Sequence, residues 1–259
     1  MKEIVNINQL FEDFPLQKTR RGILKWWNST GQRHFPWRET RDPFKVLVAE
    51  ILLHRTKADQ IVPLYQCFLE KYPGLHSIAE SSPCELEKSF HSAGLHWRWK
   101  LLRSMAVDIE TRFNGQIPQR YEDLISLSGV SHYIASAVRC FAFEYPDVLL
   151  DTNTVRVTGR IFGLPITDSS RRSKLFREVL GRFIDSKHPR EFNFALIDFA
   201  AKVCRPKPKY PQHEDCPISK YCMFYQNAAA ETGNALNNKS LAKDSKNASL
   251  RQMGITEAS

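Results

Sequence analysis

Residues 124–160 read LISLSGVSHYIASAVRCFAFEYPDVLLDTNTVRVTGR, and this stretch decides the fold that the sequence predicts. A short apolar helix expected at 121–127 breaks at SGVS, residues 128–131, and a second helix is expected over about 132–143. A helix, a tight glycine-containing hairpin and a second helix direct backbone N–H groups outward. Such groups at a helix N-terminus bind phosphate without charged side chains, so the hairpin is a candidate phosphate site.

Asp151 follows the hairpin and the apolar run Val148-Leu149-Leu150. A further helix, carrying Arg156 and Arg160, is expected to begin directly after it. Aspartate before a helix is a common N-cap. Asp151 is therefore either a helix cap or an acid held beside bound DNA.

Composition fits one large domain or two small ones that bind a polyanion. The 259 residues are 42% hydrophobic, and 37 Lys and Arg against 28 Asp and Glu give a net charge of +9. This charge suits DNA, because phosphate neutralisation supplies most non-specific affinity, although basic proteins without a nucleic-acid role exist too. No apolar run approaches membrane-spanning length, and the polar start lacks the apolar core of a signal peptide. We expect a cytoplasmic protein with no membrane contact and with cysteines that are reduced or bound to metal.

The phrases LSGVS, YIASAV and LDTNTVRV follow one another in residues 124–160. They resemble the helix-hairpin-helix and catalytic-aspartate segment of the endonuclease III superfamily of DNA glycosylases, and the resemblance runs from about residue 19 to 226. It implies an all-α fold of two helical lobes. Residues 1–32 and 152–226 would form one lobe with a cysteine-rich loop, residues 33–151 the barrel-like lobe, and the polar residues 227–259 a disordered tail. It also implies a monomer that acts on double-stranded DNA near the nucleoid.

Local patterns predict the remaining elements. Residues 1–18 are polar and are expected to form a loosely attached arm. Cys67 and Cys84 are expected to be small buried residues, and Trp99 is expected in the core. Further helices are expected at residues 18–28, 44–53, 58–71, 83–91, 172–184 and 192–203, and another is expected to open within the tight-turn segment 93–100 and to end at residue 113.

Glu50 lies in the almost wholly apolar helix expected at 44–53. A buried carboxylate is costly unless it is paired or protonated, so Glu50 is a candidate for a raised pKa and for acid–base chemistry. An exposed glutamate on the outer face of the helix is the alternative. The resemblance aligns Glu50 with the pocket glutamate of the adenine glycosylases and favours function.

Three positions, two in one turn and one in the hairpin helix, distinguish this chain from other branches of the family. Adenine glycosylases carry two glutamines where this chain has His54 and Arg55, in a turn that wedges into the duplex, whereas this pair resembles the thymine glycosylases of G/T mismatches. Bifunctional members carry a lysine where this chain has Tyr133, and a tyrosine cannot form the Schiff base that leads to strand cleavage. Adenine glycosylases also typically continue into a second domain, which the residues after 227 are not expected to provide.

Further DNA contacts follow from the resemblance. Leu95 and His96 sit where the family contacts the base opposite the extruded one. Gly129 and Ser131 belong to the hairpin. The family usually has a second glycine at the position of Ser131, and serine lacks the freedom of glycine at positive φ.

A cysteine-rich segment supplies four candidate metal ligands: Cys204, His213, Cys216 and Cys222. Family members with a [4Fe-4S] cluster space four cysteines by six, two and five residues. This chain keeps the first cysteine and the last gap, and His213 stands where the second cysteine belongs, after a two-residue insertion. The four could bind a [4Fe-4S] cluster with one imidazole ligand, which we expect, or a structural zinc, or no metal.

Together these features predict a monofunctional DNA glycosylase of base excision repair. It would hydrolyse the N-glycosidic bond of a thymine or uracil flipped from a G/T or G/U mismatch. Asp151 would stabilise positive charge on the sugar, while Glu50 and Tyr133 line the base pocket. An adenine glycosylase on A/G mispairs, a bifunctional lyase and a non-catalytic DNA-binding protein are the alternatives.

Overall fold

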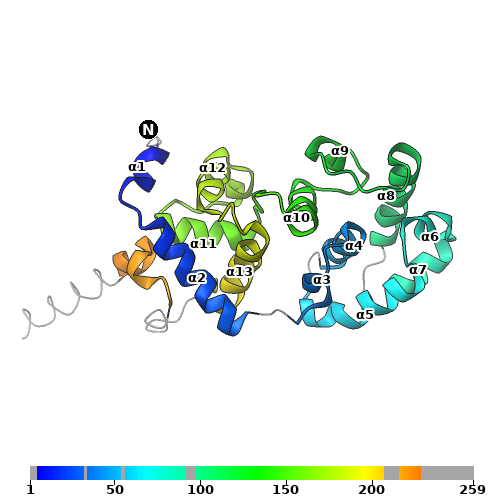
Figure 1. Cartoon of the computed structure of the whole chain (residues 1–259), viewed down its shortest axis with the longest axis horizontal. Coiled ribbons are helices and arrows are strands. Elements are labelled where there is room, and N and C mark those ends of the chain that lie inside the picture. Colours follow the sequence, from blue (N-terminus) through cyan, green and yellow to red (C-terminus); the bar gives the residue numbers. More distant parts are fainter. Residues whose placement is uncertain (1–4, 32–33, 54–55, 92–96, 207–215, 229–259) are drawn as a thin grey trace, which may run out of the picture.

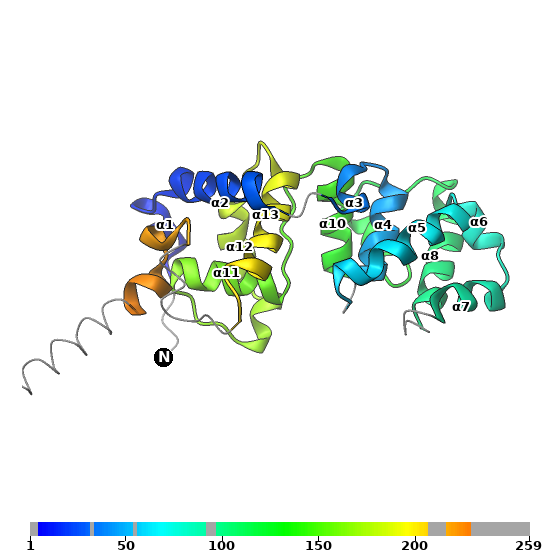
Figure 2. The same cartoon turned by 90° about the horizontal axis from the view of Figure 1, so that it is seen from below.

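The computed structural model describes residues 5–31, 34–53, 56–91, 97–206 and 216–228. These residues form helices and no strand, which confirms the all-α fold. Figures 1 and 2 show two lobes side by side, joined by two crossings of the chain.

One lobe, here the central lobe, is built from the middle of the chain. Its helices are α3 (Pro36–Glu39), α4 (Pro43–Leu53), α5 (Ala58–Lys71), α6 (Leu75–Glu80), α7 (Pro83–His91), α8 (Arg98–Phe113), α9 (Tyr121–Ile125) and α10 (His132–Phe143). The other, the terminal lobe, combines both ends. It contains α1 (Ile7–Glu12), α2 (Leu16–Thr30), α11 (Thr152–Phe162), η1 (Asp168–Arg172), α12 (Lys174–Phe183), α13 (Pro189–Lys202) and η2 (Ser219–Tyr221).

Helix α4 is the centre of the central lobe. Its sequence PFKVLVAEILL is almost wholly apolar, and a helix of this kind must be covered on most of its surface. Helices α5, α8 and α10 pack against it, and Leu47 and Leu52 are fully buried. The cover also encloses Glu50, which is 8% exposed, so the alternative of an exposed glutamate is wrong.

In the terminal lobe, α13 packs against both α2 and α11. Helix α1 also belongs to this lobe, because the rings of Phe11 and Phe14 lie 5.0 and 4.6 Å from the ring of Phe162. The expectation of a loosely attached arm is therefore wrong for residues 5–18. Asn6 caps α1, since its Oδ1 accepts a hydrogen bond from the backbone N–H of Asn8 at 3.1 Å.

A buried ion pair connects the two lobes. Arg38 of α3 donates to both carboxylate oxygens of Asp198 of α13, at 2.7 and 2.9 Å. The indole N–H of Trp27 in α2 donates to the same carboxylate at 2.8 Å. The Arg38 and Asp198 side chains are 8% and 1% exposed. Charges so deeply buried require partners, so this contact fixes how the lobes sit against each other.

The hairpin between α9 and α10 has the geometry that its sequence predicts. Gly129 has φ +78°, where a side chain is strained and where a Cβ would meet Leu101 at 3.0 Å. Ser131 has φ −82° and ψ 165°, an extended conformation that serine adopts without strain. Its hydroxyl accepts a hydrogen bond from the N–H of Ile134 at 3.2 Å, so it acts as the N-cap of α10. A second glycine is not required here.

Two expectations about side-chain exposure differ from the structure. Trp99 is 9% exposed and belongs to the core, as expected, but Cys67 and Cys84 are exposed. Both cysteines lie on the outer faces of amphipathic helices, where residue type alone predicts burial poorly. Within the described residues, no helix is both long and apolar enough to cross a membrane.

Candidate active site

A cleft of about 970 Å³ lies between the lobes. The central lobe contributes Glu50, Ser131 and Tyr133 to its lining, and Asp151 lies at the start of α11. The three residues predicted to be catalytic therefore line one cleft, although they are up to 101 positions apart in the chain. Gly129 lies in the hairpin that precedes Ser131.

Asp151 is both a helix cap and a lining residue of the cleft. Its Oδ1 accepts hydrogen bonds from the backbone N–H groups of Asn153 at 2.9 Å and Thr154 at 2.7 Å. Its Oδ2 accepts one from the side-chain amide of Asn153 at 2.9 Å. In return, the Thr154 hydroxyl accepts a hydrogen bond from the backbone N–H of Asp151 at 3.0 Å. Since a helix N-terminus favours negative charge, the fold holds a carboxylate in fixed orientation at the edge of the cleft.

Glu50 and Tyr133 are electrostatically coupled to Asp151. Burial raises the pKa of Glu50 to about 7; the nearby Arg38 cation opposes this shift and the Asp151 carboxylate adds to it. Burial also raises the pKa of Tyr133 well above its ordinary value, and Glu50 and Asp151 raise it further. Near neutral pH the cleft thus offers a neutral phenol and a carboxyl group that can give or take a proton.

The Arg38–Asp198 pair also lines this cleft, and sequence reasoning assigned it no role. The guanidinium of Arg38 lies over the rings of Phe35 and Phe194, 5.4 and 4.7 Å from their centroids. A carboxylate inside the apolar run of α13 is the same signal that singled out Glu50, so Asp198 was detectable from the sequence. Its pairing with Arg38, 160 positions away, was not.

Five of the predicted site residues lie outside the described residues: His54, Arg55, Leu95, His96 and His213. The described residues Leu52 and Arg98, each two positions from one of these segments, are in contact. The Arg98 guanidinium at the start of α8 donates to the carbonyl of Leu52 near the end of α4, at 2.8 Å. Trp97, the described neighbour of His96, is 52% exposed.

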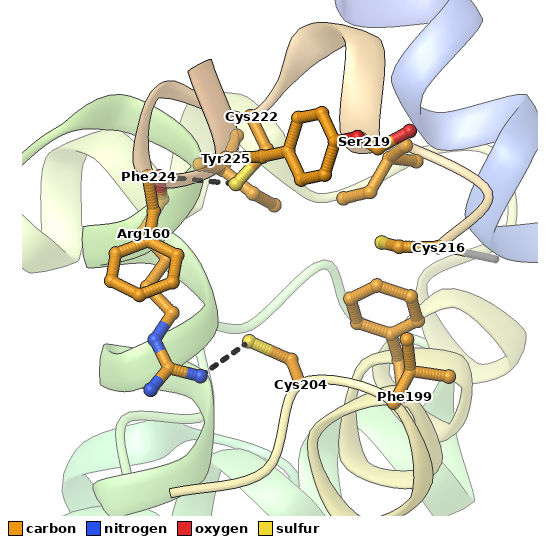
Figure 3. A pocket seen from close by; sticks show the side chains of 11 residues that line it. Arg160, Phe199, Cys204, Cys216, Ser219, Cys222, Phe224 and Tyr225 are labelled. Carbon is orange, nitrogen blue, oxygen red and sulfur yellow. Dashed lines mark hydrogen bonds between the residues drawn. The ribbon is translucent and has the colours of Figure 1, made fainter. Parts of the chain in front are cut away.

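Three of the four predicted metal ligands surround one small cavity in the terminal lobe. Figure 3 shows the sulfur atoms of Cys204, Cys216 and Cys222 directed towards a common space. Burial raises the pKa of the Cys216 thiol to about 11 and also raises that of Cys222. An iron or zinc ion would deprotonate such thiols on binding. Arg160, Ser219 and several aromatic and aliphatic side chains complete the cavity wall.

No three His, Cys, Asp or Glu side chains among the described residues lie close enough to hold one metal ion. The [4Fe-4S] cluster expected at this loop stays a prediction.

Known proteins resemble this chain in sequence and in structure. The thymine/uracil-DNA glycosylase of Pyrobaculum aerophilum is 41% identical over 217 residues, which are 81% of this chain and 92% of that protein. An adenine DNA glycosylase of Buchnera aphidicola is 28% identical over 79% of this chain and 58% of that protein. No family model matches the chain.

The structure of a thermostable thymine-DNA glycosylase superposes with a TM-score of 0.73 and 33% identity, covering 82% of this chain and 98% of that one. An endonuclease III trapped on DNA superposes with a TM-score of 0.70 at 22% identity, covering 87% of this chain and all of that one, and so shares the fold. With the helix-hairpin-helix, the cleft and the capped Asp151 in place, this chain belongs to the thymine/uracil-DNA glycosylase family, which has the fold of endonuclease III.

Proposed function

We propose that this protein removes thymine or uracil mispaired with guanine by hydrolysing the N-glycosidic bond. The observation that carries the proposal is the cleft between the lobes, where Asp151 lies in one lining with Glu50 and Tyr133. A cleft of about 970 Å³ has room for an extruded nucleotide. Mispairing lowers the energy needed to extrude a base, which favours mismatched sites.

Asp151 supplies the electrostatic part of the reaction. As the bond between base and sugar breaks, positive charge develops on the sugar, and a fixed carboxylate beside it lowers the energy of the transition state. The hydrogen bonds from Asn153 and Thr154 hold the Asp151 carboxylate in place before the substrate arrives. No reorganisation is then needed at the moment of reaction. The carboxylate also orients or deprotonates the attacking water.

Glu50 and Tyr133 act on the leaving base. With a pKa of about 7, Glu50 is partly protonated at neutral pH and can protonate the departing pyrimidine. Tyr133 stays a neutral phenol, which packs on the base or hydrogen-bonds to it. The Arg38–Asp198 pair closes the same lining and presents a cation held in fixed orientation.

The proposed reaction stops at base removal. Strand cleavage through a Schiff base requires a lysine amine at the sugar, and the phenol of Tyr133 cannot form that intermediate. Incubation with a G/U duplex should therefore give strand breaks only after alkali treatment, and borohydride should trap no covalent adduct. The variant Tyr133→Lys places an amine at this position and should produce the adduct. An adduct with the wild-type protein would contradict the proposal.

Other expectations stand as part of the proposal. A [4Fe-4S] cluster held by Cys204, His213, Cys216 and Cys222 would be structural, because its cavity lies in the terminal lobe and shares no lining residue with the cleft. The protein would act as a monomer on double-stranded DNA, in the cytoplasm and close to the nucleoid.

A further inference from the structure

Two basic side chains with no assigned role line the cleft on opposite sides. Lys57 lies in the central lobe at the N-cap position of α5, and Arg171 lies in the terminal lobe within η1. Both are exposed, and within the described residues neither forms a hydrogen bond or an ion pair with another side chain. Their charged groups are therefore available to a ligand that enters the cleft.

Arg171 has a rigid support. The short helix η1 begins with a capping box in which the Thr167 N–H donates to the hydroxyl of Ser170 at 2.9 Å. Ser170 is 3% exposed, and η1 packs against both α11 and α12. Because α11 begins directly after Asp151, the same helix that presents the carboxylate also supports the arginine.

The charges in the cleft lining show why these cations matter. The lining contains the carboxyl groups of Glu50, Asp59, Asp151 and Asp198, and the cations Arg38, Lys57 and Arg171. Since Asp198 already binds Arg38, the lining available to a ligand carries the acids Glu50, Asp59 and Asp151 and two cations. A nucleotide brings a phosphate on each side, and Asp151 and Asp59 repel both. Binding therefore requires positive charge near those phosphates.

We propose that Lys57 and Arg171 bind the two phosphates that flank the extruded nucleotide, one from each lobe. The inference rests on the proposed function, because it presumes that a nucleotide enters this cleft. The two contacts would hold the sugar over Asp151 and would hold the strand across the gap between the lobes. Phosphate contacts of this kind position the substrate but do not select the base.

The salt dependence of DNA binding tests the proposal. The full chain is titrated, by fluorescence anisotropy at several salt concentrations, against a duplex with a tetrahydrofuran abasic analogue opposite guanine and against the fully paired duplex. The variants are Lys57→Ala, Arg171→Ala and the double variant. Arg172→Ala, the exposed neighbour in η1, and Lys88→Ala in α7 are matched controls, because neither residue lines the cleft.

Each lost phosphate contact should reduce the slope of log K against log salt by about 0.9. We expect this reduction for each single variant on the abasic duplex, about twice as much for the double variant, and less on the paired duplex. Arg171→Lys keeps the charge and should keep the wild-type slope. The controls should match the wild type on both duplexes.

Two results would overturn the inference. In one, Lys57→Ala and Arg171→Ala give the wild-type slope on the abasic duplex. In the other, they lose the same slope on both duplexes, which assigns them to ordinary duplex contacts. Excision assays with the wild type test the proposed function separately. If the protein excises no thymine or uracil, the proposed function fails. The salt slopes of binding still decide whether Lys57 and Arg171 contact phosphate at an opened site.

Discussion

Replacing Asp151 by asparagine separates the two roles that the structure gives this residue. Asparagine is as good an N-cap as aspartate, so its side-chain oxygen can still accept from the N–H groups of Asn153 and Thr154. The new amide nitrogen would face the Asn153 amide and lose one hydrogen bond, at a cost of about 1 kcal/mol. Alanine would lose the cap as well, for a total of about 2 kcal/mol.

The effect on excision should be far larger than the effect on folding. Opposite unit charges about 4 Å apart at a partly buried site attract each other by about 4 kcal/mol. Removing the carboxylate charge of Asp151 should therefore slow base removal by about 10³-fold. Asp151→Asn and Asp151→Ala should be similarly slow, although they differ in stability by about 1 kcal/mol.

Single-turnover excision with alkali cleavage measures the rate of each variant, and urea unfolding measures its stability. DNA binding to an abasic duplex checks that the cleft is intact. A folded Asp151→Asn protein that excises within tenfold of the wild-type rate would refute the electrostatic role. Equal stabilities of the asparagine and alanine variants would refute the capping role.

Three further predictions concern the rest of the cleft and the cysteine cavity. The pKa of Glu50 is raised from 4.5 to about 7, so its ionisation destabilises the folded protein as pH rises through this window. The stability of Glu50→Gln relative to the wild type should therefore increase by about 3 kcal/mol between pH 4 and pH 8. Thermal unfolding that shows no pH-dependent difference between the two proteins would contradict this. Asp198→Asn leaves Arg38 buried without its carboxylate partner and should lower the free energy of unfolding in urea by about 3 to 5 kcal/mol. Adding Arg38→Met to this variant should restore part of the loss. A loss below about 1 kcal/mol would show that the fold does not need the pair. Protein reconstituted with iron and sulfide should hold about four irons per chain, and Cys222→Ser should lose them; zinc or no metal in the wild type would exclude the cluster.

Much of the helical architecture followed from local patterns. The apolar runs and their breaks predicted α5, α7 and α10 at their observed bounds. Glycine at the hairpin was required by a positive φ, whereas the serine after it could be accommodated by a helix cap. The short helix α6 was not predicted, since six residues carry too little periodicity.

Long-range contacts could not be predicted in the same way. The paired spacing of Phe11 and Phe14 was visible, but their partner Phe162 lies about 150 residues away, and the polar start of the chain suggested a loose arm. The partner of Arg38 is equally distant. A single sequence does not show which distant residues pair, so the ion pair between the lobes could be identified only from the structure.

Asp151 shows how much of the candidate site could be predicted from the sequence. The cap and the acid were alternatives when only the sequence was considered, because both need an aspartate before a helix. The structure makes them compatible, since the capped carboxylate lies in the cleft lining with Glu50 and Tyr133. The catalytic roles of all three remain predictions, as do the DNA contacts of His54 and Arg55.

The most direct test of the account is single-turnover excision on labelled duplexes with G/T, G/U, A/G and A/oxidised-guanine pairs, each analysed with and without alkali. We expect cleavage at thymine and uracil opposite guanine, dependent on alkali, and none at adenine. Cleavage at adenine instead would place the protein with the adenine glycosylases and would contradict the proposed pyrimidine target. Tight binding without cleavage of any pair would contradict the catalytic role of Asp151.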